Sequence, residues 1–189
     1  MSTDLELAYN ALSGKQAAYD LLWRYYDGDH PLKYSTQRLR EIFKHLNVSF
    51  VENWCAVVVD SAIERVNIAG FVVAGNEPAQ DQLNADFAAT ELTLDSDDAH
   101  LAALVCGEAF VLIWPNEAGE PEAYYNDPRM CHVQYDADNP REKRWAAKWW
   151  IAEDGRYRLV LYYTDTIEYY ISTGKADSVR DATSFVADE

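Results

Sequence analysis

Four side chains within six positions, Asp95, Asp97, Asp98 and His100, are of types that bind metal ions or exchange protons. Carboxylates and an imidazole around a divalent ion would suit a metal-dependent hydrolase. The same acids are also a common signal of a helix start, because negative charge is favourable near the N-terminus of a helix. We interpret the cluster as a helix start with Asp95 as its cap, and we keep the hydrolase as the alternative.

A second set of ligand types, His100, Cys106, Cys131 and His132, lacks the spacing of a zinc site. It contains no C-x-x-C or H-x-x-x-H pair, and Cys131 and His132 would point to opposite faces of a strand. With Cys55 the cysteines are an odd number in apolar or β-like settings, which indicates buried thiols rather than a disulfide framework. No Walker, G-x-G-x-x-G or G-x-S-x-G motif occurs. We therefore expect no enzyme activity, no metal site and no cofactor.

The charge balance argues against a nucleic-acid or membrane surface. The 189 residues include 16 Lys and Arg against 32 Asp and Glu, a formal charge of −16. Such a field repels phosphate unless the basic residues cluster, and here they form only two short groups, at residues 38–44 and 141–148. Any contact with DNA should be local or weak. No signal peptide and no apolar run of about 20 residues is found, so we expect a soluble protein made inside the cell.

Apolar spacing predicts helices along the first part of the chain. One begins at Thr3, and Ser13 is a candidate cap for a second that ends in the turn at residues 27–31. A third is expected from residue 35 or 36 to Asn47.

A fourth helix is expected over about residues 51–66. It is apolar over most of its circumference and should therefore be a central, buried helix. After a short strand at residues 70–73, Asn76 caps a further helix. The last helix of this part starts at Asp95 and closes at Gly107.

From residue 109 the period of the apolar residues changes to two, which is typical of strands. Strands are expected at residues 109–114, 130–135, 145–151, 157–163 and 166–171. The fold class is therefore α+β, with N-terminal helices followed by an antiparallel β meander. We divide the chain into a mainly helical part, a β-rich part and a polar tail or truncated chain end, at residues 1–107, 108–174 and 175–189.

Aromatic side chains would occupy both faces of this sheet. The sequence has six Trp and 13 Tyr, and Trp145, Trp149 and Trp150 fall on one predicted strand. A sheet that is apolar on both faces needs cover on both. At a charge of −16, packing against helices or another subunit is favoured over stacking on nucleic-acid bases.

Several segments, in this order, resemble the portal proteins of long-tailed bacteriophages infecting Gram-positive bacteria. The resemblance extends over about residues 19–170 and is carried by the order and spacing of the pieces. They are Tyr25-Tyr26-Asp27-Gly28-Asp29-His30-Pro31-Leu32, Asn53-Trp54, Val58-Val59-Asp60-Ser61, Glu64-Arg65-Val66, Ile68-Ala69-Gly70-Phe71, Gly107-Glu108-Ala109-Phe110-Val111, Trp114-Pro115, Asp127-Pro128 and Lys148-Trp149-Trp150.

The resemblance implies a structural subunit of a homo-oligomeric ring, usually a dodecamer, at one capsid vertex of the virion. Double-stranded DNA is packaged and ejected through such a ring without tight binding. The implied partners are other portal subunits, the major capsid and scaffolding proteins, terminase and the head-tail adaptor, with assembly in the host cytoplasm and no membrane. Portal subunits are usually more than twice this long, and this chain resembles the N-terminal wing region alone.

The residues on which the interpretation depends are structural. Gly28 and Pro31 form the turn after the second predicted helix, and Trp54 and Asp60 belong to the predicted central helix. Gly70 and Gly107 are expected to form backbone turns. Trp149 and Trp150 are expected to pack on the sheet. A general binding module remains a third possibility.

Overall fold

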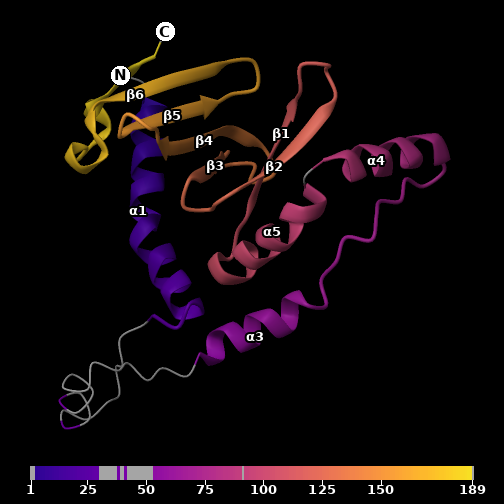
Figure 1. Ribbon diagram of the computed structural model, residues 1–189. Coiled ribbons are helices and arrows are strands. Elements are labelled where there is room, and N and C mark those ends of the chain that lie inside the picture. The colour runs from indigo at the N-terminus through magenta and orange to yellow at the C-terminus, as the bar shows by residue number, and fades with distance from the viewer. Residues whose placement is uncertain (1–2, 30–37, 39–40, 42–52, 91, 189) are drawn as a thin grey trace. The chain divides into compact units, whose positions relative to one another are not determined.

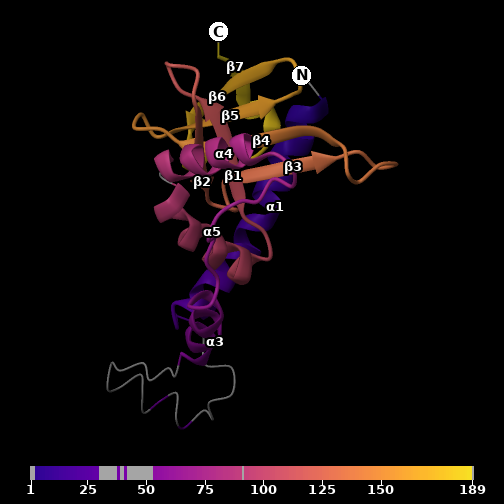
Figure 2. The ribbon, with the colours of Figure 1, turned by 90° about the vertical axis from the view of Figure 1, so that its right-hand side faces the viewer.

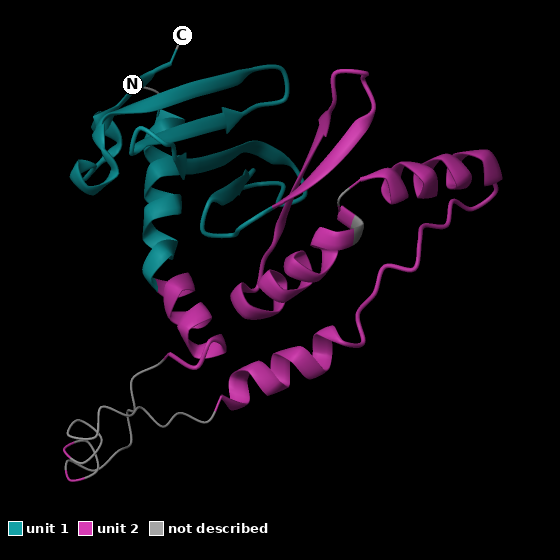
Figure 3. Cartoon of the chain, in the orientation of Figure 1, with its two compact units in different colours: residues 1–17, 126–189 teal, residues 18–125 magenta. Residues whose placement is uncertain are grey.

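The computed structural model describes residues 3–29, 38, 41, 53–90 and 92–188. The chain forms two compact units, shown in different colours in Figure 3. Unit 1 combines Met1–Ala17 with Asn126–Glu189, and unit 2 is Ala18–Tyr125. These units differ from the division expected at residue 107, because the first residues of the chain pack with the last.

Unit 1 is one helix against an antiparallel sheet (Figure 1). The helix is the first part of α1 (Thr3–Tyr26). The sheet has the order β3-β4-β5-β6-β7, with bounds Cys131–Tyr135, Lys143–Ile151, Arg156–Tyr162, Ile167–Lys175 and Phe185–Ala187. The α+β class and the antiparallel meander are confirmed, and the expected strand at residues 109–114 corresponds to β1 of unit 2.

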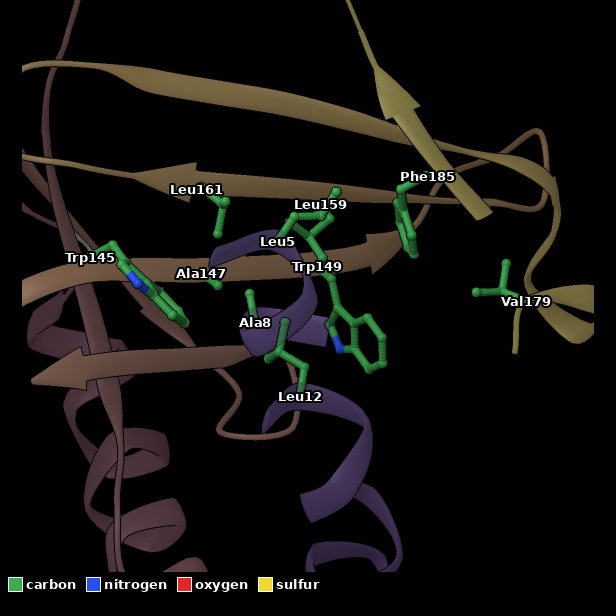
Figure 4. Close-up of a cluster of buried hydrophobic side chains, with 10 residues drawn as sticks. All are labelled: Leu5, Ala8, Leu12, Trp145, Ala147, Trp149, Leu159, Leu161, Val179 and Phe185. Atoms are coloured by element: carbon green, nitrogen blue, oxygen red, sulfur yellow. The ribbon is translucent and has the colours of Figure 1, made fainter. Parts of the chain in front are cut away.

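The core of unit 1 follows from the alternation along β4. Trp145, Ala147 and Trp149 are buried, while the residues between them are only partly covered. Antiparallel pairing sets Ala147 opposite Leu161 and Trp149 opposite Leu159, so these side chains share one face of the sheet. Figure 4 shows how Leu5, Ala8 and Leu12 of α1 cover that face. Their spacing of three and four residues puts them on one stripe of the helix.

The expectation of a break at Ser13 is wrong, because α1 runs without interruption from Thr3 to Tyr26. Gly14 lies inside this helix, and a Cβ built there would meet nothing within 4 Å. A glycine in a helix interior costs only about 1 kcal/mol relative to alanine. Burial of the Leu5–Leu12 stripe outweighs that cost, since each buried leucine contributes about 1.5 to 3 kcal/mol.

The residues expected to form a polar tail are instead an ordered part of unit 1. Two short 3-10 turns, Ala176–Ser178 and Ala182–Ser184, lead into β7, which pairs with β6 and is labelled beside it in Figure 2. Val179, Ala182 and Phe185 are buried. The few apolar residues of this polar segment fall where they reach the core.

Unit 2 contains the second part of α1, three further described helices and a hairpin. The described elements after α1 are α3 (Trp54–Ile63), α4 (Glu77–Ala89), α5 (Leu92–Cys106), β1 (Phe110–Pro115) and β2 (Pro121–Asn126). The Asn76 cap is confirmed, because its side chain accepts a hydrogen bond from the Ala79 amide at 3.2 Å and Pro78 lies in the first turn. Strand β2 was not expected. The helix predicted from residue 35 or 36 to Asn47 lies outside the described residues apart from two positions.

The strand expected at residues 70–73 is absent from the described structure, although the segment is held along α4. The Asn84 side chain accepts a hydrogen bond from the Phe71 amide at 2.8 Å and donates one to the Phe71 carbonyl at 3.0 Å. Gln80 accepts from the Val73 amide at 3.3 Å. Side-chain amides of a helix thus take the place of a partner strand.

Candidate functional site

The four residues of the hydrolase alternative do not come together. Helix α5 begins at Leu92, so Asp95 lies in its first turn and is not its cap. On one helix, residues three apart share a side, which pairs Asp95 with Asp98 and Asp97 with His100 on opposite sides. Within the described part of the chain, no three His, Cys, Asp or Glu side chains are placed to hold a metal ion. Nothing in the structure supports the hydrolase alternative.

The cysteines are correctly expected to be thiols, but they differ in burial. None of the three is in a disulfide; Cys131 is buried, Cys106 is half-buried and Cys55 is exposed. The expectation that all three are buried is therefore wrong. Cys55 is exposed because it lies on α3, which itself is not buried.

Helix α3 is the main departure from the expected packing. It was expected to be central, yet none of its residues is buried, and Trp54 is 66% exposed. Val57 and Val58, one turn further, are also exposed. These three side chains form a stripe at spacings of three and four, while the helix packs elsewhere against α5. The apolar circumference of this helix indicated that it would be buried, but it did not indicate which element would cover it.

Two of the predicted structural residues, Gly28 and Asp60, belong to the junction between the end of α1 and helix α3. The Asn53 side chain caps α3 by accepting from the Ala56 amide at 3.1 Å and donates to the Tyr26 carbonyl at 2.6 Å. Gly28 has φ +76°, and a Cβ there would approach the Asn53 side chain to 3.3 Å. The glycine therefore permits both the left-handed turn and the close approach of the cap.

Asp60 secures the same junction from inside α3. It accepts a hydrogen bond from the Tyr26 hydroxyl at 2.9 Å. Burial and this bond to Asp60 raise the pKa of Tyr26 above its usual value, so the hydroxyl remains a donor at neutral pH. Tyr26 and Asn53 were not singled out as site residues, although both stand in the motifs that carry the resemblance.

The remaining predicted glycines and Pro31 have separate settings. Gly70 has φ +144°, and a Cβ there would lie 2.9 Å from Asn84 Oδ1, so glycine is required by both backbone and space. Gly107 ends α5 with φ +83° and open space around it. Pro31 lies outside the described residues.

The two predicted tryptophans, Trp149 and Trp150, are neighbours on β4 and therefore lie on opposite faces of the sheet. Trp149 is buried against α1, stacks on Tyr157 at 4.8 Å between ring centroids, and donates its indole N–H to the Arg129 carbonyl at 3.1 Å. Trp150 is half-buried on the other face, with the Lys148 ammonium 5.8 Å from its ring centroid. Trp149 is a core residue of unit 1, and Trp150 contributes to the second face.

The surface of unit 2 is both apolar and acidic. Among its residues of described burial, only Ser96 and Ala102 are buried. Large exposed apolar side chains include Trp54, Val57, Val58, Val72, Leu83, Leu94, Leu104, Val111, Ile113 and Trp114. Residues 66–128 hold six Asp and six Glu, twelve acids in all, and no Lys or Arg. Such a surface suits contact with protein and opposes contact with phosphate.

No described helix is long and apolar enough to cross a bilayer.

No curated protein matches the chain. A family model does match, described as phage portal protein, SPP1 Gp6-like, over residues 15–186. The match spans both units and nearly the whole chain, and it agrees with the motifs that run from Tyr25 to Trp150. The chain therefore belongs to the phage portal protein family.

Proposed function

We propose that this chain is the wing part of a portal subunit, in a ring of usually twelve copies at one capsid vertex. Double-stranded DNA passes through the ring during packaging and ejection. The family match over residues 15–186 carries the proposal. The family is structural, which agrees with the packed core of unit 1 and with the apolar surface that unit 2 offers to other proteins.

Two properties of unit 2 support a role in assembly. Its exposed apolar side chains include Trp54 and Ile113, which are 66% and 68% exposed. Removing such surface from water contributes about 25 cal/mol per Å², so subunit contacts would be favourable. The absence of any Lys or Arg between Arg65 and Arg129 suits a wall that must not hold passing DNA.

The finer partners belong to the same proposal. They are the major capsid and scaffolding proteins, terminase and the head-tail adaptor, with assembly in the host cytoplasm before the protein enters the virion. The helical and β-rich parts at residues 1–107 and 108–174 would then both belong to the wing.

Immunogold labelling of virions tests this function. An epitope inserted after Gly155, in the exposed turn between β4 and β5, should label one vertex per particle, at the junction with the tail. Opened particles should be included so that the antibody reaches internal surfaces. Labels distributed over the capsid or along the tail, with the same insertion shown to be folded, would contradict the proposal.

A further inference from the structure

Two exposed surfaces of the chain carry side chains of opposite charge. The first is the hairpin of β1 and β2, in which Val111, Ile113, Trp114 and Tyr124 are exposed. Its turn adds Glu117 and Glu120, also exposed. A two-stranded hairpin is marginally stable on its own, and one that exposes apolar side chains gains from being covered. This hairpin is therefore an apolar surface with an acidic tip.

The second surface is the turn between β3 and β4, at residues 136–142, together with the first two residues of β4. Arg141, Lys143 and Arg144 are exposed there, and the exposed Tyr135 is paired in register with Lys143. Residues 141–148 hold four of the 16 basic residues of the chain with one acid, Glu142.

The same turn also carries three acids, Asp136, Asp138 and Glu142, and two of them accept hydrogen bonds within the turn. Asp136 accepts hydrogen bonds from the amides of Asp138 and Asn139 at 2.8 and 3.0 Å, and these bonds hold its pKa below the usual value. Glu142 accepts from the Asn139 side chain at 3.4 Å. The exposed cations of the turn thus stand beside two acids, Asp136 and Glu142, that already accept hydrogen bonds within the turn.

We infer that the β1–β2 hairpin of one copy docks on the β3–β4 turn of a second copy. This rests on the proposed ring function and names the surfaces that join neighbouring subunits. The hairpin supplies Glu117 and Glu120 to Arg141 and Lys143, and Trp114 offers a ring face to a cation beside Tyr135. Because the two surfaces differ, the contact is heterologous, which is the type that closes into rings.

The charges of the two surfaces favour a second copy of this chain as the partner that docks there. Copies with a net charge of −16 repel one another, so association requires a place where opposite charges meet. The hairpin lies within the stretch that lacks Lys and Arg, and the turn is the densest group of cations described in the structure. Contact between Glu117 or Glu120 and the cations of the turn would therefore lower the repulsion between copies.

A charge-exchange experiment tests the contact between copies. Variant X carries Glu117→Lys and Glu120→Lys, and variant Y carries Arg141→Glu and Lys143→Glu. In X alone both surfaces are basic, and in Y alone both are acidic, so each should lose self-association. In an equimolar mixture every X hairpin meets an acidic Y turn and every Y hairpin meets a basic X turn. Mixing should therefore restore association, which a contact within one chain cannot do.

Sedimentation velocity at several salt concentrations provides the measurement. We expect the wild-type chain to self-associate at about 0.1 M salt, where the Debye length of about 10 Å screens the long-range repulsion between copies more than the contact pairs. X and Y should each bind at least about tenfold more weakly, and the mixture should regain most of the affinity. The control, Glu153→Lys with Asp165→Lys, changes the net charge as in X but on other turns, and it should not reproduce the loss. Circular dichroism should show that all variants are folded.

Three results would overturn the inference. They are a wild-type chain that stays monomeric at every concentration, X and Y that associate as the wild type does, and a mixture that shows no recovery. Fluorescence anisotropy with duplex DNA covers the competing ligand, and binding to DNA that Y abolishes would assign the turn to nucleic acid instead. Vertex labelling that succeeds while the mixture fails would keep the ring function and reject only these surfaces.

Discussion

Asn84 of α4 makes the two backbone hydrogen bonds with Phe71 that a neighbouring strand would otherwise make, at 2.8 and 3.0 Å. The ring of Phe71 packs edge to face on Phe87, 5.2 Å away between centroids. One side-chain amide and one aromatic pair thus fix an extended segment on a helix.

Asn84→Ala should free this segment. Loss of both bonds exposes the Phe71 amide, and a typical hydrogen bond contributes about 0.5 to 1.5 kcal/mol. Hydrogen exchange at Phe71 should accelerate about three- to tenfold, while amides in β4 keep their rates. Gln82→Ala, on the same helix with its side chain bonded only to Asp86 at 2.6 Å, is the control and should leave Phe71 unchanged. Equal effects of both substitutions would show that helix α4 as a whole, and not the clamp, was perturbed.

Leu12→Ala should strongly destabilise unit 1. Leu12 is fully buried against the sheet, and truncation of a buried leucine costs about 2 to 5 kcal/mol. Leu7→Ala makes the same chemical change on the same helix at a position 46% exposed, and should cost less than about 1 kcal/mol. Urea unfolding followed by tryptophan fluorescence compares the two. Similar midpoints would mean that α1 is not docked on the sheet.

Three glycine-to-alanine changes should differ in their effect on stability, according to the backbone angle φ and the room for a Cβ at each position. Gly14→Ala should stabilise by up to about 1 kcal/mol, because Gly14 lies in a helix with room for a Cβ. Gly107→Ala has room but a positive φ, so it should destabilise by about 1 kcal/mol or somewhat more. Gly70→Ala adds the collision with Asn84 and should cost most. Thermal unfolding gives the order, and a neutral Gly70→Ala would contradict the described turn.

Acid should weaken the turn that carries Asp127. Burial alone would raise the pKa of this carboxyl, but hydrogen bonds from the Arg129 guanidinium and amide, at 2.6 and 2.7 Å, bring it below its usual value. A pKa lowered by folding stabilises above the unfolded value, near 4, and this contribution is lost as the pH falls through the folded value. The stability gap between wild type and Asp127→Asn should therefore shrink as the pH drops from 7 to about 3.

Urea midpoints across this pH range provide the measurement. Asp165→Asn, the same change of charge on the exposed turn between β5 and β6, corrects for altered net charge. A gap between wild type and Asp127→Asn that stays constant with pH would show that the Asp127 carboxylate is not held by Arg129.

The sequence predicted correctly those features that depend on residues close together in the chain. The alternation of Trp145, Ala147 and Trp149 indicated a strand, and the Asn76–Pro78 signal indicated a helix start, because both depend on neighbours in sequence. The pairing of β7 with β6 could not be predicted from three residues in a polar stretch. Nor could the exposure of Trp54, since the partner that covers an apolar helix is not encoded in the helix itself.

The candidate site shows the same limit. Gly28 and Gly70 were identified by type, but the residues that make glycine necessary there, Asn53 and Asn84, lie 25 and 14 positions away. Asparagine side chains that bind distant backbone leave no periodic signal. The acids at residues 95–98 indicated a helix, because charge near a helix start is a local signal, but they placed the start at Asp95 instead of Leu92.

Unit 1 joins the first seventeen residues to the last part of the chain. During translation, the Leu5, Ala8 and Leu12 stripe leaves the ribosome long before the strands that cover it have been made. Unit 2, with its exposed apolar side chains, emerges in between. The nascent chain must therefore keep its first helix soluble until residues 126–188 have been made, and the charge of its acidic middle segment opposes aggregation during this interval.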